Sequence, residues 1–241
     1  MDYLTHFQLH LESLRPPHKS SGGLHAYASE AGNCDRQLYY RLLLQPGTDP
    51  DAAPDLATST IAYHIGNNLH DEWQAMMAKL HPNNFTGEVK WQHPAAPEVA
   101  TVSGRCDGIY KDDRGKRIAL EIKSLSGYRY KVAMKSGRPY TRDAMQAALS
   151  MYVLEADEVQ LVYLCKDWID VENEPMRMWT YPVLPSVAIH ELDRQTRILR
   201  TVQTRGPIPA RTARGEIIDN IDKDPECRYC VFYDLCELQG E

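Results

Sequence analysis

The sequence predicts an α/β fold with a mixed central sheet flanked by helices. Residues 99–110 and 117–124 have strand character, and a tight polar hairpin at 111–115 joins them. Residues 58–80 carry apolar side chains at spacings of three and four, which is typical of an amphipathic helix; this stripe consists of Ile61, Ile65, Leu69, Trp73, Met76 and Leu80. Predicted helices precede and follow the group of predicted strands along the chain, and this order indicates one layered α/β core.

The remaining elements follow from periodicity and from proline, glycine and polar stretches. We expect helices over 4–15, 35–44, 58–80, 140–156 and 186–205, and strands over 87–92, 99–110, 117–124, 158–166 and 176–183. Pro16 and Pro17 end the first helix, and the residues at 18–24, 45–54 and 205–226 read as loops. We therefore expect a single domain over 1–241, with its core at about 58–183.

Composition limits the classes of function. The net charge is −6, so any contact with nucleic acid must come from a local basic patch. The first residues lack the basic and apolar regions of a signal peptide, and no stretch approaches the roughly 18 apolar residues of a membrane span. These features predict a soluble, intracellular protein with no membrane partner. In that reducing compartment the six cysteines are expected to be thiols or metal ligands.

Two carboxylates and a lysine are expected to meet on the strand pair. Glu121 and Lys123 share one face of their strand because strand side chains alternate, and Asp107 lies on the preceding strand between two glycines. Paired carboxylates bind hard cations such as Mg²⁺ or Mn²⁺, and a neighbouring lysine can position water or stabilise charge on a phosphate. The pattern favours hydrolysis of phosphodiesters, whereas a solvated strand face is the simpler alternative.

The cysteines give a second signal near the C-terminal end of the sequence. Cys227, Cys230 and Cys236 form a C-x₂-C-x₅-C cluster, and Cys34 is the best candidate for a fourth ligand. Cys106 and Cys165 lie in apolar strands and are expected to be buried. Four thiolates could hold zinc or a 4Fe–4S cluster, and the uneven spacing favours the 4Fe–4S cluster. Such a cluster would join residues 29–45 to residues 206–241 as a structural staple.

Taken together, these residues resemble the PD-(D/E)XK nuclease superfamily. The resemblance is to its RecB-like branch with an iron–sulfur cluster, specifically the CRISPR-associated exonucleases and their phage-encoded relatives. It spans about residues 29–236 and is carried by five motifs: Gly66 to His70, Gly104 to Gly108, Glu121 to Lys123, Gln146 to Tyr152, and the four cysteines. The resemblance implies a restriction-endonuclease-like core and a location in the cytoplasm of a bacterial, archaeal or phage-infected cell.

The resemblance also implies roles for individual residues. His70, Asp107 and Glu121 would bind Mg²⁺ or Mn²⁺, with the backbone carbonyl of Ile122 as a further ligand. Lys123 would position the attacking water, and Gln146 would orient that water or a phosphate. Gln146 and Tyr152 are six residues apart, which is wider than the usual spacing, so Tyr152 either stacks on a base or packs in the core.

A run of aromatic and basic residues follows the Glu121 strand. Aromatic stacking combined with phosphate contacts holds single-stranded DNA without reading its sequence. The DNA-binding candidates are Arg129, Tyr130, Lys131, Arg138 and Tyr152, with Tyr128, Lys135, Tyr140 and Arg142 close by. A solvated loop is the alternative for this run. The late helix carries Arg194, Arg197 and Arg200 at spacings of three, which fits a polar face.

The expected function is a metal-dependent DNA exonuclease that acts on single-stranded 5′ ends and contains a structural 4Fe–4S cluster. Its role would lie in recombination, repair or CRISPR spacer processing, with an integrase or recombination proteins as partners. Assembly into a homo-oligomer is left open. No phosphate-binding loop of an ATP-driven helicase and no zinc-finger or helix-turn-helix signature is present. Two alternatives remain: a non-catalytic DNA-binding adaptor subunit, and a nuclease stapled by zinc.

Overall fold

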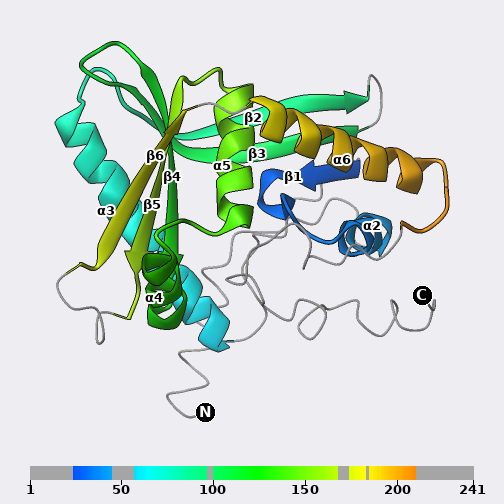
Figure 1. Cartoon of the computed structure of the whole chain (residues 1–241), viewed down its shortest axis with the longest axis horizontal. Helices are drawn as coiled ribbons and strands as arrows, with labels where there is room; N and C mark the ends of the chain where they lie inside the picture. Colours follow the sequence, from blue (N-terminus) through cyan, green and yellow to red (C-terminus); the bar gives the residue numbers. More distant parts are fainter. Residues whose placement is uncertain (1–23, 45–56, 97–99, 168–173, 183–184, 210–241) are drawn as a thin grey trace, which may run out of the picture.

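The computed structural model describes residues 24–44, 57–96, 100–167, 174–182 and 185–209. The strands are β1 (Leu24–Tyr27), β2 (Thr86–Ala96), β3 (Ala100–Lys111), β4 (Arg117–Leu125), β5 (Glu158–Cys165) and β6 (Met176–Pro182). The helices are the 3-10 turn η1 (Ala28–Glu30), α2 (Asp35–Leu44), α3 (Ala57–Leu80), α4 (Gly127–Ser136), α5 (Thr141–Val153) and α6 (Pro185–Gln203). The described part therefore has the expected α/β composition (Figure 1).

The six strands form one mixed sheet, in which β3 is the longest strand and pairs with three others. β1 and β4 pair with successive stretches of the same edge of β3, and β5 and β6 follow β4 in the sheet. β2 pairs with the other edge of β3. The β1–β3 and β4–β5 pairs are parallel, and the remaining pairs are antiparallel. Pairing of β3 with β1 ends at Ser103, and pairing with β4 begins at Gly108. The sheet thus forks at residues 104–107, and this fork carries Asp107.

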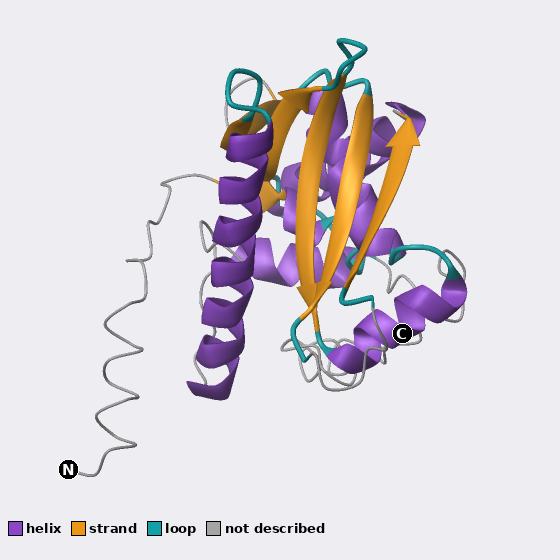
Figure 2. Cartoon of the chain, turned by 90° about the vertical axis from the view of Figure 1, so that its left-hand side faces the viewer, coloured by secondary structure: helices purple, strands orange, loops and turns teal. Residues whose placement is uncertain are grey.

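Helices cover the sheet on both sides. Helix α3 lies on one side, whereas α5 and α6 lie on the other (Figures 1 and 2). On the α3 side, Trp73 and Met77 pack against a buried cluster that includes Leu120 and Ile122 of β4. On the other side, α5 contributes Ala147 and Met151 to a cluster with Cys106 and Ala119. The strand alternation expected for β4 is therefore confirmed, because Leu120 and Ile122 face α3.

The orientation of α3 differs from the sequence expectation. The predicted apolar stripe includes Ile65, Met76 and Leu80, yet these side chains are 43%, 39% and 63% exposed. Trp73 of the predicted stripe packs toward the sheet as expected, but it does so together with Met77, which lay outside the stripe, and His70 lies near that same face. The helix is therefore rotated relative to the predicted stripe, and this rotation brings the polar residue His70 toward the strands. The spacing of apolar residues alone does not predict this.

A buried ionic network ties α6 to the first described residues. The guanidinium of Arg194 donates to both carboxylate oxygens of Glu191, to Asp35 Oδ1 at 2.8 Å, and to the backbone carbonyls of Glu30 and Asn33. Its side chain is 11% exposed, so Arg194 does not lie on a polar helix face. Burial alone would lower the pKa of Arg194, but the hydrogen bonds and charges of Glu191 and Asp35 raise it. This network fixes η1 and the loop before α2.

Three described elements were not expected from the sequence. Strand β1 and η1 fall in a stretch read as loop or left unassigned, and α4 falls in the run of aromatic and basic residues. The turn at residues 112–116 agrees with its prediction, since the amides of Arg114 and Lys116 both donate to Asp112 Oδ1. The helix expected at 4–15 lies outside the described residues. None of the described helices is long and apolar enough to cross a membrane.

Candidate active site

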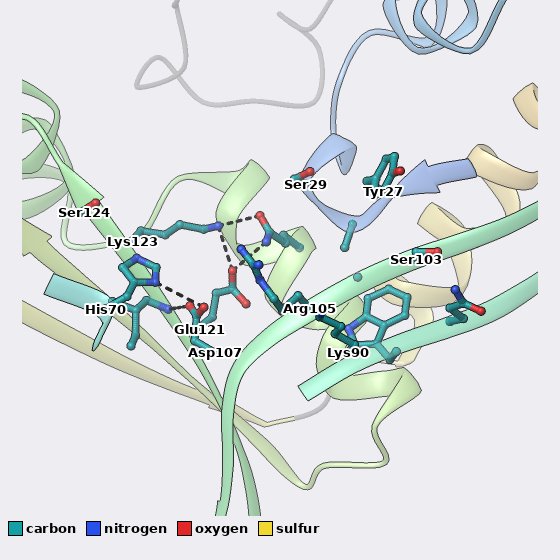
Figure 3. A pocket seen from close by; sticks show the side chains of 16 residues that line it. Tyr27, Ser29, His70, Lys90, Ser103, Arg105, Asp107, Glu121, Lys123 and Ser124 are labelled. Carbon is teal, nitrogen blue, oxygen red and sulfur yellow. Dashed lines mark hydrogen bonds and ion pairs between the residues drawn. The ribbon is translucent and has the colours of Figure 1, made fainter. Parts of the chain in front are cut away.

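The fork in the sheet opens into a cleft of about 460 Å³. Its walls come from β2, β3, β4, α3, α5 and η1 (Figure 3). Five sequence-predicted residues line this cleft: His70, Asp107, Glu121, Lys123 and Gln146. Ile122 lines it as well. Residues from distant parts of the sequence are thus gathered at one place, where β1 and β4 separate along the edge of β3.

Asp107 is held by contacts that replace regular strand pairing. Its carboxylate Oδ2 accepts a hydrogen bond from the backbone N–H of Ile122 at 2.6 Å, and its backbone carbonyl accepts one from Gln74 Nε2 at 2.9 Å. Cys106 and Ile109 pack in the same apolar cluster although they are three residues apart, so alternation is interrupted around Asp107. This interruption turns the carboxylate into the fork.

Gly108 makes room at the same interruption. A Cβ on Gly108 would overlap the ring of Phe85, so only glycine fits beside that ring. Gly108 thus makes room for the ring of Phe85 rather than for the carboxylate of Asp107.

Glu121, Lys123 and Gln146 form a closed set of hydrogen bonds. Lys123 Nζ lies 2.9 Å from Glu121 Oε1 and donates to Gln146 Oε1 at 2.8 Å, and Gln146 Nε2 donates to Glu121 Oε1 at 2.8 Å. Glu121 is buried, with 2% exposure. Burial raises the pKa of Glu121, the ammonium of Lys123 opposes that shift, and the negative charge of Asp107 adds to it. The lysine is thus fixed with its charge at the cleft.

His70 approaches the carboxylates from α3. Its Nδ1 lies 3.4 Å from Asp107 Oδ1, and its side chain is 27% exposed. One turn earlier, a Cβ on Gly66 would come within 2.8 Å of Ser124 Oγ on β4. Glycine at this position therefore lets α3 lie close to β4, which brings His70 to the fork.

The residues present fit a divalent cation by their chemistry. Glu121 Oε2 is buried without a hydrogen-bond partner, and the charge of nearby Asp107 penalises the ionised form of Glu121. A cation bound between the two carboxylates would relieve both costs. Within the described ranges, no three His, Cys, Asp or Glu side chains lie close enough together to hold a metal ion. The ligand set of His70, Asp107, Glu121 and the Ile122 carbonyl thus remains a prediction.

The predicted DNA-binding residues do not act as one surface. The ring of Tyr130 is fully buried among residues of β5, and its hydroxyl donates to the Glu174 carbonyl, so the expectation that it contacts DNA is wrong. Tyr152 packs against the main core cluster, which agrees with its packing alternative. The Arg129 guanidinium lies 4.5 Å from the ring centroid of Tyr140. Lys131 and Arg138 are exposed on and after α4, and their contact with DNA stays a prediction.

The cysteine predictions divide between described and undescribed residues. Cys106 and Cys165 are buried, as expected. Cys34 is partly exposed and precedes the first residue of α2. Cys227, Cys230 and Cys236 lie outside the described residues.

Several residues of the cleft were missed by sequence reasoning. Gln74 is not among the residues that line the cleft, but it donates to the backbone carbonyl of Asp107, and its place one turn after His70 on α3 could have revealed it. The other missed residues include Ser29 of η1, Lys90 of β2, and Ser103 and Arg105 of β3. Ser103 and Arg105 precede Asp107 at strand spacing, so alternation along β3 could have placed them beside it.

The geometry can be compared with solved structures. The crystal structure of SSO0001 aligns with a TM-score of 0.56 and 17% identity, and the match covers 98% of this chain and 97% of that protein. The alkaline exonuclease LHK-Exo from Laribacter hongkongensis aligns with a TM-score of 0.55 and 13% identity over 75% of this chain and 89% of the exonuclease. Its complex with dAMP gives a TM-score of 0.56 at the same identity.

The chain shares the fold of these proteins. At such low identity the likeness concerns the fold alone. No protein-family model and no curated protein sequence matches the chain. The expected α/β fold with a mixed sheet is confirmed and is the fold of a solved exonuclease. The narrower resemblance to RecB-like iron–sulfur exonucleases remains a prediction.

Proposed function

We propose that this protein is a metal-dependent deoxyribonuclease that removes nucleotides from DNA ends. One observation carries the proposal: the fork of the sheet gathers two buried carboxylates, a lysine, a glutamine and a histidine around a single cleft. The shared fold with an alkaline exonuclease supports it. Acidic residues and an ammonium around one cleft are suited to phosphodiester hydrolysis.

The side chains divide this chemistry among them. Asp107, Glu121 and His70 would hold Mg²⁺ or Mn²⁺, which when bound neutralises negative charge on the reacting phosphate. Lys123 carries a fixed positive charge because Glu121 and Gln146 hold its ammonium. That ammonium can donate to a phosphate oxygen or to a water molecule in the cleft. Gln146 holds Lys123 and Glu121 in position, because its side chain accepts a hydrogen bond from Lys123 and donates one to Glu121.

The finer features of this function extend the same proposal. We infer action on single-stranded DNA from 5′ ends, in recombination, repair or CRISPR spacer processing, with an integrase or recombination proteins as partners. A second candidate is a non-catalytic DNA-binding adaptor. The presence of His70, Asp107, Glu121 and Lys123 around one cleft argues against the adaptor, because a site that no longer cuts need not keep all four.

Digestion of end-labelled DNA separates the two candidates. We expect purified protein to shorten single-stranded oligonucleotides progressively in the presence of Mg²⁺ or Mn²⁺. Excess EDTA should stop cleavage, and added Mn²⁺ should restore it. Parallel reactions with double-stranded DNA and with the label at either end report strand preference and polarity. DNA that is bound but never shortened under any of these conditions would favour the adaptor.

We further propose a 4Fe–4S cluster held by Cys34, Cys227, Cys230 and Cys236. Arg36 Nε donates to the backbone carbonyl of Pro209 at 3.1 Å, so the chain just before the C-terminal segment is tied beside the start of α2. Arg194 fixes the loop at Asn33 from the other side. Pro209 is the last described residue before the other three cysteines, and its contact Arg36 lies two residues from Cys34 in the sequence, which supports Cys34 as the fourth ligand.

Absorption of anaerobically purified protein tests this cofactor. We expect a brown solution with broad visible absorption, and its loss when Cys34 is replaced by Ser. The Cys165→Ser variant is the matched control, because Cys165 is buried in β5 and should leave the absorption unchanged. A colourless protein that contains zinc would support the zinc staple instead.

A further inference from the structure

Two consecutive side chains of β3 contact the main chain of β4 on either side of Glu121. The carboxylate of Asp107 accepts a hydrogen bond from the backbone N–H of Ile122 at 2.6 Å, and the thiol of Cys106 donates to the backbone carbonyl of Leu120 at 3.2 Å. Leu120 and Ile122 are the neighbours of Glu121 in the sequence. These two contacts, the Cys106–Asp107 clamp, therefore fix the backbone of Glu121 relative to Asp107.

The same thiol also contacts the main chain of its own strand at the fork. Cys106 Sγ lies 3.1 Å from the backbone carbonyl oxygen of Gly108, and Gly108 pairs with Leu120 where the pairing of β3 with β4 begins. A thiol carries one hydrogen, so the two carbonyl oxygens share a single donor. Cys106 therefore joins both strands at the last pair before they separate.

The thiol of the clamp is buried behind the cleft. Cys106 is 0% exposed, packs against residues of β4 and α5, and does not line the cleft. The carboxylates of Asp107 and Glu121, in contrast, point into the cleft (Figure 3). Because the thiol is fully buried, water cannot take over its hydrogen bonds. Any influence of Cys106 on the proposed chemistry must therefore pass through the two carboxylates.

Strand β2 gives Asp107 no regular support from the other edge of β3. β2 pairs with β3 at Gly108 and at Cys106, but the register skips Asp107, which lies opposite Glu88. Glu88 has a φ of 47°, in the left-handed region that residues other than glycine rarely adopt. Backbone strain of this kind persists only where surrounding contacts impose it. The orientation of Asp107 therefore depends on its contacts with β4 and α3, and the clamp supplies the contact with β4.

We propose that Cys106 is a positioning residue, whose thiol holds the carboxylates of Asp107 and Glu121 at the spacing that a divalent cation needs. This inference rests on the proposed nuclease function and adds a residue that touches neither the cation nor DNA. The simpler role of a buried cysteine is that of a small apolar residue. The two roles make opposite demands on a replacement. A small apolar role tolerates Ala better than Ser, whereas a positioning donor tolerates Ser better than Ala.

Binding of Mn²⁺ without DNA, measured by calorimetry, and the kinetics of DNA cleavage test the proposal. We expect Cys106→Ala to lower the Mn²⁺ affinity or kcat roughly 10- to 100-fold, the usual effect of losing a group that orients metal ligands, while KM for DNA changes little. Cys106→Ser keeps a donor and should stay close to the wild-type values. Cys165→Ala and Cys165→Ser are the matched controls, because Cys165 is 1% exposed in β5 and does not line the cleft.

The ranking of the variants decides between the two roles. Equal Mn²⁺ affinity and kcat in Cys106→Ala and Cys106→Ser, or better values in Cys106→Ala, would overturn the positioning role. Circular dichroism reports whether each variant is folded. Cys106→Val fills the space without a donor, and it replaces Cys106→Ala in the comparison if that variant does not fold.

Hydrogen exchange at the backbone amide of Ile122 separates failure of the clamp from failure of the proposed function. This amide donates to Asp107, so its exchange reports the clamp without a metal or DNA. We expect faster exchange in Cys106→Ala than in Cys106→Ser. If the wild-type protein neither binds Mn²⁺ nor cuts DNA, the nuclease proposal fails and the exchange rates alone decide. Faster exchange in Cys106→Ala then supports the clamp, and equal exchange in the two variants overturns it.

Discussion

Replacing Glu121 with Gln is expected to reduce DNA cleavage roughly a thousand-fold, the effect of losing about 4 kcal/mol of transition-state stabilisation. The carboxylate is the most buried acidic group of the cleft, and its Oε2 has no protein partner. Glutamine keeps an oxygen that can accept from Lys123 and Gln146, but it supplies no negative charge to a cation. The chemistry should therefore be lost while the hydrogen-bonded set survives.

Stability is expected to move in the opposite direction to activity. Burial and the charge of Asp107 penalise the ionised form of Glu121 and raise its pKa although the ammonium of Lys123 opposes the shift, so a neutral glutamine avoids a net penalty. The thermal midpoint of Glu121→Gln should equal or exceed that of the wild-type protein, as measured by circular dichroism. Glu158→Gln is the control, because it removes a carboxylate of β5 that pairs with Lys116 at the surface. A folded Glu121→Gln protein that cleaves as fast as this control would contradict the assignment of Glu121.

The strand pair with its hairpin could be predicted because its signals are local. Asp112 caps the turn through two backbone amides, and alternation along β4 separates Glu121 and Lys123 from Leu120 and Ile122. Helix α5 was predicted from periodicity, and its Gln146 reaches the site as expected. These features depend on residues close together in the sequence, so the sequence alone was sufficient to predict them.

The rotation of α3 and the fork of the sheet could not be predicted in the same way. Both depend on where a helix or strand meets a distant partner, as when Gly66 lets α3 lie close to Ser124. Strand β1 is only four residues long and pairs with β3 more than 70 residues later, so no local pattern reveals it. Helix α4 begins at Gly127 and buries only Tyr130 and Ala133 beside that glycine, which is too few to show a helical period.

Arg194 is the clearest case of a residue whose role depends on distant partners. In sequence it belongs to an evenly spaced series with Arg197 and Arg200, and such series usually mark a solvated face. In the structure its partners lie on the same helix and also some 160 residues earlier, at Glu30, Asn33 and Asp35. The charge of Arg194 therefore matters for the fold in a way that its neighbours in sequence do not suggest.

Replacing Arg194 with Met is expected to destabilise the protein by about 3–5 kcal/mol, because removal of one partner leaves buried charges uncompensated. Glu191 is fully buried and Asp35 is 6% exposed, so neither can regain water without local unfolding. Such a loss is a large fraction of the roughly 5–15 kcal/mol that typically stabilises a domain. Urea denaturation followed by circular dichroism measures it as a lower midpoint.

Two further variants separate the charge of Arg194 from its shape. Arg197→Met removes a guanidinium from the same helix that also reaches Asp35 but is 66% exposed, and its cost should stay below about 1 kcal/mol. Arg194→Lys keeps the charge, but an ammonium cannot reproduce the planar fork that binds Glu191 through two nitrogens. We therefore expect Arg194→Lys to be destabilised nearly as much as Arg194→Met. If Arg194→Lys were instead as stable as the wild-type protein, charge alone would hold the network, and the geometric account of how η1 is fixed at the cleft would fail.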